Sequence, residues 1–333
     1  MELIKILNKF DKSKIKAGDG RKDGIYPLYT CSPKVNKFLD NYLYDTEAII
    51  LGTGGNPVIN YHKGKFSYSS DCLVVQSKGK FENKYIYYYL ISKINEIAKM
   101  FRGAGLKHLN KKEFFKMNIE LINIEEQKKI IKELDLINKL MDYKRKQIKL
   151  FDDFIKSQFA EMFGNPIIND KKFEFKQIGE VTKIVTGTTP DTNDIENWNG
   201  RINWITPAEI KDDTLYVYDT QRKITEKGQK SKALTLMPKG TVIFSTRAPI
   251  GKTAIAGNEM CCNQGFKNCI CSININNIYL YYVLKNNKIY FNNLGTGATF
   301  KELSKRVFEK VKIAVPPITL QNQFSEIVKQ IDK

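Results

Sequence analysis

The chain has 333 residues, of which 54 are Lys or Arg and 36 are Asp or Glu, giving a formal net charge of +18. Its length and a hydrophobic share of 42% support two globular domains, each with its own core. No stretch approaches the roughly 18 apolar residues of a membrane span, and the N-terminal apolar run is too short for a signal peptide, so a cytoplasmic protein is expected. The charge favours nucleic acid as the partner, because Lys and Arg that neutralise phosphates release condensed counterions. A solubilising surface in a Lys- and Asn-rich proteome is the alternative.

A basic, glycine-containing segment lies near the start of the first predicted domain, residues 1–123. Its cations precede a strand and are suited to phosphate contacts, which fix the register on DNA without reading sequence. A solvated basic loop is the alternative interpretation. The candidates are Lys12, Lys14, Lys16, Arg21 and Lys22.

A buried strand is predicted at Glu47–Leu51, followed by a turn at 52–57. Turns at strand ends bring polar side chains within reach of a ligand, here Thr53 and Asn56. The run Ile86–Leu90 predicts a helix with an aromatic face, and core packing accounts best for most of its tyrosines. The glycine-rich loop that follows is flanked by three further DNA-contact candidates, Arg102, Lys107 and His108.

A long coiled-coil helix is predicted over residues 124–163, because no Gly or Pro occurs from Glu125 to Phe163 and apolar residues recur every seven positions. At 1.5 Å per residue the 39 residues from Glu125 to Phe163 span about 58 Å. It should end at Gly164, which supplies a left-handed cap, with Pro166 forbidding continuation. One row of the heptad pattern is Leu134, Met141, Ile148, Ile155 and Met162; the other is Ile130, Ile137, Lys144, Phe151 and Gln158.

The second predicted domain, residues 164–315, repeats the strand and turn of the first. Residues 241–245 read as a buried strand, and the turn at 246–252 follows it. Arg247 is the strongest candidate for a base contact, because a guanidinium can pair bidentately with guanine.

The two domains form a tandem duplication. Residues of the same character recur 194 positions apart, a period far too long for a solenoid repeat, so each copy is a domain in its own right. Two similar modules suggest two similar targets, and their different turn residues predict that the targets differ. The matching pairs include Ile119 with Ile313, Gln127 with Gln321, Ile130 with Phe324, Leu134 with Val328, and Ile137 with Ile331.

A C-terminal helix is predicted over residues 316–333, with the seam residues Phe324, Val328 and Ile331. It should lie against the central helix, because an amphipathic helix cannot bury its seam alone. Since it is short, most of the central seam is expected to be uncovered unless another protein covers it. The alternative is that the apolar stripe packs on the two domains. The predicted seam and partner-contact residues are Ile130, Leu134, Ile137, Met141, Ile148, Phe151, Ile155, Phe324, Val328 and Ile331.

The order of motifs resembles the specificity subunits of type I restriction-modification enzymes, over nearly the whole chain. Both helices open with a Pro/Ile-x-x-Gln type of pattern, Ile124–Gln127 in one copy and Pro316–Gln323 in the other. The first module carries the sequence Gly-Ile-Tyr-Pro-Leu-Tyr at 24–29. The second carries turns that are typical of the recognition domains of this family, at 186–190, 204–207, 245–251 and 263–266. The resemblance implies that further DNA-contact candidates in such turns lie near the same groove as Arg247: Thr188, Thr189, Lys252, Asn263 and Gln264.

This resemblance implies an α/β (α+β) protein with two target-recognition domains of mixed sheet plus helices, separated by a long helix that pairs with the C-terminal one. It implies a non-catalytic subunit that reads a bipartite, asymmetric site in double-stranded DNA, with the helices fixing the gap. Two methyltransferase subunits and the restriction/translocase subunits would be its partners. S-adenosylmethionine, Mg²⁺ and ATP would be bound by those partners, and this chain would hold no metal or cofactor. Consistently, the chain lacks the Asn/Asp-Pro-Pro-aromatic motif of amino-methyltransferases.

Departures from the family pattern leave alternatives open. The first module is expected to lack a counterpart of residues 164–194, which, with the short C-terminal helix, allows a truncated or diverged stand-alone DNA-binding or regulatory protein. A nuclease is a weaker alternative, since Asp170, Glu174 and Lys176 match the spacing of a metal-dependent nuclease. A phosphate-binding loop is disfavoured, because Thr246 stands where its first Gly belongs. The six cysteines form no C-x-x-C pair and read as small buried strand residues.

Overall fold

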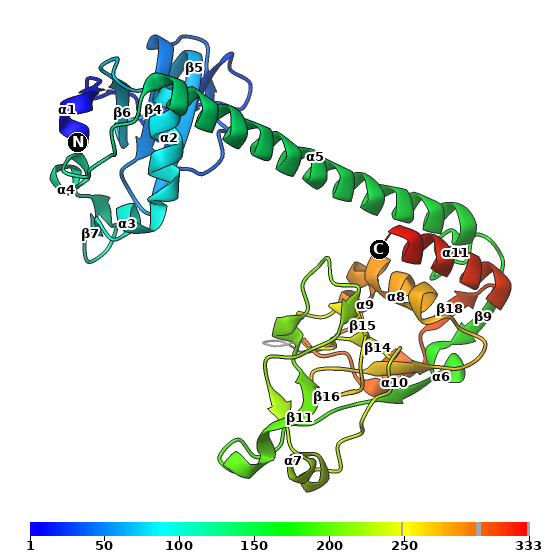
Figure 1. Ribbon diagram of the computed structural model, residues 1–333. Coiled ribbons are helices and arrows are strands. Elements are labelled where there is room, and N and C mark those ends of the chain that lie inside the picture. Colours follow the sequence, from blue (N-terminus) through cyan, green and yellow to red (C-terminus); the bar gives the residue numbers. More distant parts are fainter. Residues whose placement is uncertain (248, 298–300, 332–333) are drawn as a thin grey trace. The chain divides into compact units, whose positions relative to one another are not determined.

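The computed structural model describes residues 1–247, 249–297 and 301–331. Contacts divide the chain into two compact units, residues 1–145 and 146–333, and the dividing point falls within the long helix α5 (Ile124–Phe163). Figure 1 shows α5 as one unbroken helix, which confirms the prediction for this segment. Gly164 has a positive φ of 63°, the left-handed conformation expected at the end of the helix. Within the described residues, no helix is long and apolar enough to cross a membrane.

The first unit is built on a six-stranded mixed sheet in the order β1-β6-β4-β5-β2-β3. Its centre is β4, which is antiparallel to both neighbours, whereas β2 is parallel to β5. The strands are β1 (Leu7–Lys9), β2 (Tyr26–Tyr29), β3 (Phe38–Leu39), β4 (Tyr44–Gly52), β5 (Val58–Tyr68) and β6 (Cys72–Ser77).

Both faces of β4 are buried, which explains its uninterrupted apolar run. Ile49 and Leu51 lie in the core that includes Ile86 and Leu90 of α2, the cyan helix over the sheet in Figure 1. Ile50 faces a second, aromatic-rich core on the other side of the sheet. The remaining elements of this unit are α1 (Leu3–Ile6), η1 (Ala17–Asp19), α2 (Asn83–Ser92), α3 (Ile94–Ala98), β7 (Phe101–Arg102), β8 (His108–Leu109) and α4 (Lys111–Phe115).

The second unit repeats this arrangement in a five-stranded sheet of order β10-β17-β14-β15-β12. As in the first unit, β14 is antiparallel to both neighbours and β12 is parallel to β15. The strands are β10 (Thr182–Val185), β12 (Tyr216–Val217), β14 (Val242–Phe244), β15 (Thr253–Ala256) and β17 (Asn268–Cys271). The other repeated elements are α6 (Ile178–Val181), α8 (Asn277–Asn286), α9 (Lys288–Asn293), α10 (Lys305–Glu309) and α11 (Ile318–Ile331). Strand β18 (Lys312–Val315) has no equivalent strand in the described part of the first unit.

The expected absence of a counterpart for residues 164–194 is wrong for part of that segment. In the first unit α1 leads into β1, which pairs antiparallel with β6; in the second, α6 leads into β10, which pairs antiparallel with β17. The first of these helices has only four residues, too few for a helical period to be recognised. Strand β9 (Glu174–Gln177), which pairs with β18, lies before this repeated portion.

A buried glutamine fixes the start of α5 in the first unit and of α11 in the second. The Gln127 amide accepts a hydrogen bond from the Glu82 backbone N–H at 2.8 Å and donates to the carbonyls of Lys80 and Ile122 at 3.4 and 3.0 Å. The Gln321 amide makes the same three bonds, to residues again 194 positions later. Both side chains are fully buried, and their repeated bonds confirm the duplication at atomic detail.

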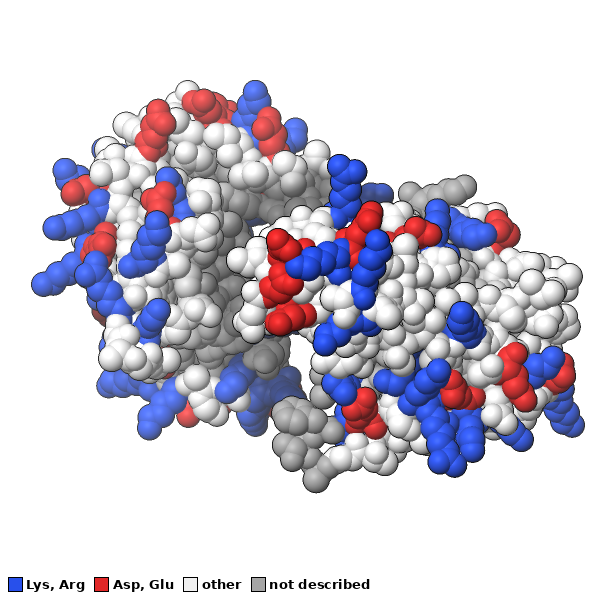
Figure 2. Space-filling view, turned by 90° about the horizontal axis from the view of Figure 1, so that it is seen from below, with Lys and Arg blue, Asp and Glu red and all other residues white. Residues whose placement is uncertain are grey.

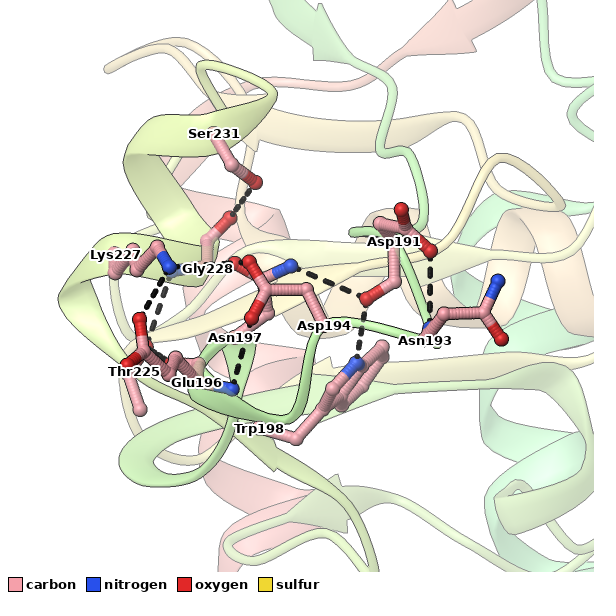
Figure 3. A network of polar contacts seen from close by, with 10 residues as sticks. All are labelled: Asp191, Asn193, Asp194, Glu196, Asn197, Trp198, Thr225, Lys227, Gly228 and Ser231. Carbon is pink, nitrogen blue, oxygen red and sulfur yellow. Dashed lines mark hydrogen bonds and ion pairs between the residues drawn. The ribbon is translucent and has the colours of Figure 1, made fainter.

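The second unit also carries an extension that has no equivalent strand pairing in the described part of the first. It consists of the sheet β13-β11-β16 with short helices at its end. Figure 3 shows how polar contacts tie loop 191–198 to α7: the Lys227 ammonium lies 3.1 Å from the Asp194 carboxylate, and the Thr225 hydroxyl donates to the Glu196 carbonyl at 2.6 Å. The elements are η2 (Ile195–Asn197), β11 (Trp198–Ile205), η3 (Pro207–Glu209), β13 (Lys223–Ile224), α7 (Glu226–Ser231) and β16 (Met260–Cys262).

The predicted pairing of the C-terminal helix with the central one is confirmed, but the packed row of side chains differs from the predicted seam. Phe159 and Phe163 are buried, and their rings lie 5.4 and 5.5 Å from the ring of Phe324. Of the predicted row on this part of α5, Ile155 is buried, whereas Ile148 is 61% exposed. The contact therefore follows positions four residues apart, because this end of α5 packs on the core of the second unit as well as on α11.

Other predicted seam residues are less buried. Ile130 and Leu134 are half-buried, and Phe324 and Val328 are fully buried. Ile331 is half-buried, and the last two residues of the predicted C-terminal helix lie outside the described part. The exposed members are Ile137, Met141, Ile148 and Phe151.

Candidate nucleic-acid interface

In the first unit, the turn after β4 lies beside the loop between β7 and β8. The Leu109 backbone N–H donates to the Thr53 carbonyl at 2.9 Å, and Gly55 N–H donates to the Lys107 carbonyl at 2.9 Å. Five predicted candidates are thereby brought to one edge of the sheet. Asn56, Lys107 and His108 are exposed there. Thr53 is buried instead, and its hydroxyl donates to the Asp71 carbonyl at 2.7 Å, so it shapes the turn. Arg102 is exposed and ion-paired with Glu113 at 2.9 Å.

The second unit builds the same edge with equivalent backbone bonds. Thr246 N–H donates to the Gly265 carbonyl at 2.8 Å, as Thr53 N–H does to Asp71, and Leu303 N–H donates to the Thr246 carbonyl at 2.9 Å. The next residue in each unit forms a β-bridge across to the neighbouring loop. That bridge joins Arg247 to Glu302 here, and it joins Gly54 to His108 in the first unit. The two modules thus present different side chains from one shared backbone geometry.

A hollow of about 370 Å³ gathers most of the candidates of the second unit. Arg247, Lys252, Asn263 and Gln264 line it, and the Thr189 hydroxyl donates to the Gln264 side-chain oxygen at 2.9 Å. The Lys252 ammonium donates to the Pro207 carbonyl at 2.8 Å, which anchors it at the wall of the hollow. Thr188 contributes through its backbone, since its carbonyl accepts a hydrogen bond from the Trp204 indole at 3.1 Å.

Glu302 is a site residue that the sequence analysis missed. Its carboxylate lies 3.0 Å from the Arg247 guanidinium and 3.8 Å from the ammonium of Lys267. Lys267 is almost fully buried, and this burial lowers its pKa despite the opposing charge of Glu302. Arg247 is half-exposed and oriented by the acid, a suitable state for a group that pairs with a base edge. No local signal marks Glu302, because its partner is 55 residues away along the chain.

The N-terminal basic segment is only partly available to phosphates. Arg21 is ion-paired with Asp40 and lies 3.8 Å from Asp23. The other four candidates are exposed and have no ion pair within the described residues: Lys12, Lys14, Lys16 and Lys22.

Positive charge also gathers beside this segment at α4. Burial and the nearby ammonium groups of Lys9 and Lys12 lower the pKa of Lys111. On the face shown in Figure 2, however, Lys and Arg side chains are not gathered in one patch but are spread widely, with Asp and Glu among them. Net charge alone therefore does not locate a DNA surface.

The residues of the nuclease-like spacing have structural contacts. Asp170 accepts a hydrogen bond from the Asn165 backbone N–H at 2.9 Å, just after the end of α5. Glu174 and Lys176 form an ion pair of 3.1 Å on β9. The Asp170 bond favours a role in closing the helix end, and the ion pair lies within a strand, in agreement with a chance match of spacing.

The family model described as "Type I restriction modification DNA specificity domain" matches residues 1–150 and 170–333. The chain belongs to this family. It is 35% identical over 165 residues to the type I restriction enzyme MjaIX specificity subunit of Methanocaldococcus jannaschii, covering 49% of this chain and 38% of that protein. It is 26% identical over 278 residues to the putative MjaX specificity subunit of the same organism, covering 78% of this chain and 64% of that one.

Matched segments therefore span less than two thirds of the length of either of these specificity subunits. A crystal structure of the S subunit of a type I restriction-modification system from M. genitalium superposes with a TM-score of 0.71 at 13% identity, covering 100% of this chain and 88% of that one. The two proteins share a fold, which confirms the predicted α/β class with two sheet-containing domains and a long helix.

Proposed function

We propose that this chain is the DNA-recognition subunit of a type I restriction-modification complex and reads a bipartite, asymmetric site. The main support is the pair of equivalent sheet edges, which share backbone bonds but carry Gly54 and His108 in one unit and Arg247 and Glu302 in the other. One geometry with two sets of side chains suits the reading of two different half-sites, because base contacts carry the sequence information.

The chain acts without chemistry of its own in this proposal. Two methyltransferase subunits and the restriction/translocase subunits supply catalysis, and they bind S-adenosylmethionine, Mg²⁺ and ATP. The exposed apolar residues of α5 are the surface offered to the methyltransferase subunits, since large apolar side chains clustered on a surface favour protein contacts. They are Ile137, Met141, Ile148 and Phe151.

Co-expression with the methyltransferase gene of the same system tests the proposal. Single-molecule sequencing of methylated adenines in the host DNA should give one bipartite motif with a fixed gap, which disappears when this gene is deleted. A motif that survives the deletion would contradict the proposal. DNA binding by the chain without any such motif would favour a stand-alone DNA-binding protein.

A further inference from the structure

A ten-residue stretch carries the same pattern of positive charge in both modules. It runs from the loop beside the sheet edge onto a short helix, residues 107–116 in the first unit and 301–310 in the second. When the two copies are aligned with an offset of 194 residues, every Lys or Arg in one stretch matches a Lys or Arg in the other. We call these residues the repeated basic set: Lys107, Lys111, Lys112 and Lys116, with Lys301, Lys305, Arg306 and Lys310.

This agreement is absent from the neighbouring stretches on both sides. Between residues 72 and 106, no Lys or Arg matches a Lys or Arg 194 positions later; Lys84, for example, matches Ile278. The same holds between residues 117 and 137, where Lys132, for example, matches Glu326. A generally lysine-rich composition would scatter such matches through the repeat, so it does not explain their confinement to one stretch.

Packing does not account for the agreement either. Phe114 and Phe308 are fully buried at equivalent positions, and the core requires residues of this kind there. All members of the repeated basic set are exposed, however, and the fold places no such demand on an exposed cation. Within the described residues only Lys305 of the set has an ion pair, with Glu309 at 3.2 Å. The shared charge therefore points to a ligand that both modules bind.

The position of the set indicates what that ligand is. The Lys107 carbonyl accepts a hydrogen bond from the Gly55 N–H at the sheet edge, and Lys301 directly precedes Glu302, the bridge partner of Arg247. The bases read at the two edges would differ under the proposed function, but the phosphate backbone that carries them is the same for every sequence. Lys is depleted in protein–protein interfaces, whereas it is a main source of phosphate contacts.

We infer that the repeated basic set is a phosphate-backbone clamp, present once in each module, that holds the DNA duplex while the neighbouring edge reads the bases. This inference rests on the proposed function and adds the residues that would bind DNA without regard to sequence. Because each copy has the same charges, both should contribute alike to the salt dependence of binding.

Two double variants test the clamp, Lys112→Ala with Lys116→Ala in the first module and Arg306→Ala with Lys310→Ala in the second. Matched controls remove two exposed lysines outside the set from each unit, Lys34 and Lys80 or Lys232 and Lys239. Fluorescence anisotropy of the purified full chain measures binding to a labelled duplex containing the methylation motif and to one in which that motif is scrambled. Thermal unfolding verifies that each variant is folded.

Each clamp variant should reduce the slope of log Kobs against log salt concentration by about 1.8, that is about 0.9 for each lost phosphate contact, on both duplexes. The controls should retain the wild-type slope. Wild-type slopes in folded clamp variants would overturn the inference, as would loss of methyltransferase co-purification with unchanged slopes, which would make the set a protein-docking surface. Failure of the wild-type chain to bind either duplex would contradict the proposed function together with the clamp.

Discussion

The two modules of this chain agree in their buried scaffold and differ at the sheet edge that we propose reads the bases. Gln127 and Gln321 make the same three side-chain hydrogen bonds, and the core strands follow the same order. At the sheet edge, by contrast, a glycine and a histidine in one module replace an arginine and a glutamate in the other. The duplicated scaffold thus preserves its buried polar contacts, because an unsatisfied buried group is costly, and varies the residues at the sheet edge.

The largest effect is expected at the packed row of α5. Phe159→Ala should lower the free energy of unfolding of the second unit by about 4 kcal/mol, because the ring is buried among Phe163, Tyr279 and Phe324. Ile148→Ala, on the predicted but exposed seam, should change it by less than about 0.5 kcal/mol. Urea unfolding of the isolated chain measures both changes. An equal loss of unfolding free energy in the two variants would mean that the predicted heptad row, and not the row of Phe159, carries the packing.

A smaller and symmetric effect is expected for the buried glutamines. Gln127→Ala and Gln321→Ala each leave buried backbone groups without partners, and each should destabilise its own unit by about 3 kcal/mol. Gln323→Ala, on an exposed position of α11, is the control. Hydrogen exchange of α2 and α8 reports the two units separately: Gln127→Ala should reduce the protection of α2, and Gln321→Ala that of α8. If only one of the two variants reduced protection, the two modules would not be equivalent.

The N-terminal lysines should have a moderate effect that does not depend on sequence. Lys14→Ala with Lys16→Ala removes two exposed cations, so the slope of log Kobs against log salt concentration should fall by about 1.8 on target and scrambled duplexes alike. Arg21→Ala should have less effect, because Arg21 is already paired with Asp40. A loss limited to the target duplex would assign this segment to base recognition.

The smallest effect concerns thiol reactivity at the two sheets. A hydrogen bond with Cys72 lowers the pKa of Cys31, and backbone N–H groups of Gly54 and Thr53 lower it further against the opposing effect of burial. Burial instead raises the pKa of Cys271, also half-buried, to about 12. At neutral pH Cys31 should therefore hold more thiolate and react faster with iodoacetamide.

Mass spectrometry of the labelled peptides provides the measurement. The labelling rate of Cys31 should rise with pH and level off at a lower pH than that of an ordinary thiol, and Cys31→Ser should abolish this fast phase. Bound duplex DNA should slow it, because Gly54 at the sheet edge donates its N–H to the Cys31 sulfur at 3.4 Å. Equal rates for Cys31 and Cys271 would refute the assigned difference.

Much of the fold could be predicted from the sequence because its signals are local or repeated. The absence of Gly and Pro before Gly164 defines α5, and the offset of 194 residues identifies the two modules. Burial of Phe159 could not be predicted in this way, since it depends on which face of the helix the second unit covers. The heptad period describes a helix that meets only another helix, and α5 also meets a folded core.

The sequence predicted which turns come together in the candidate site, but it did not predict what each of their side chains contacts. Arg247, predicted from its turn after a strand, and Gln264, which the family resemblance implied to lie near the same groove, both line one hollow. Thr53 has the right chemistry for a ligand contact, yet its hydroxyl is engaged by a carbonyl of its own turn. Glu302 escaped detection because its importance arises only when distant segments meet at the Arg247 bridge.

The central claim is that the two sheet edges read two different halves of one site. Methylated-adenine sequencing of cells that express the complete complex with Arg247→Ala, or separately with His108→Ala, tests it most directly. Each variant should relax the sequence at one position, Arg247→Ala in one half of the bipartite motif and His108→Ala in the other, with the gap unchanged. If both variants altered the same half, or if the motif were unchanged in both, the assignment of one half-site to each module would be wrong.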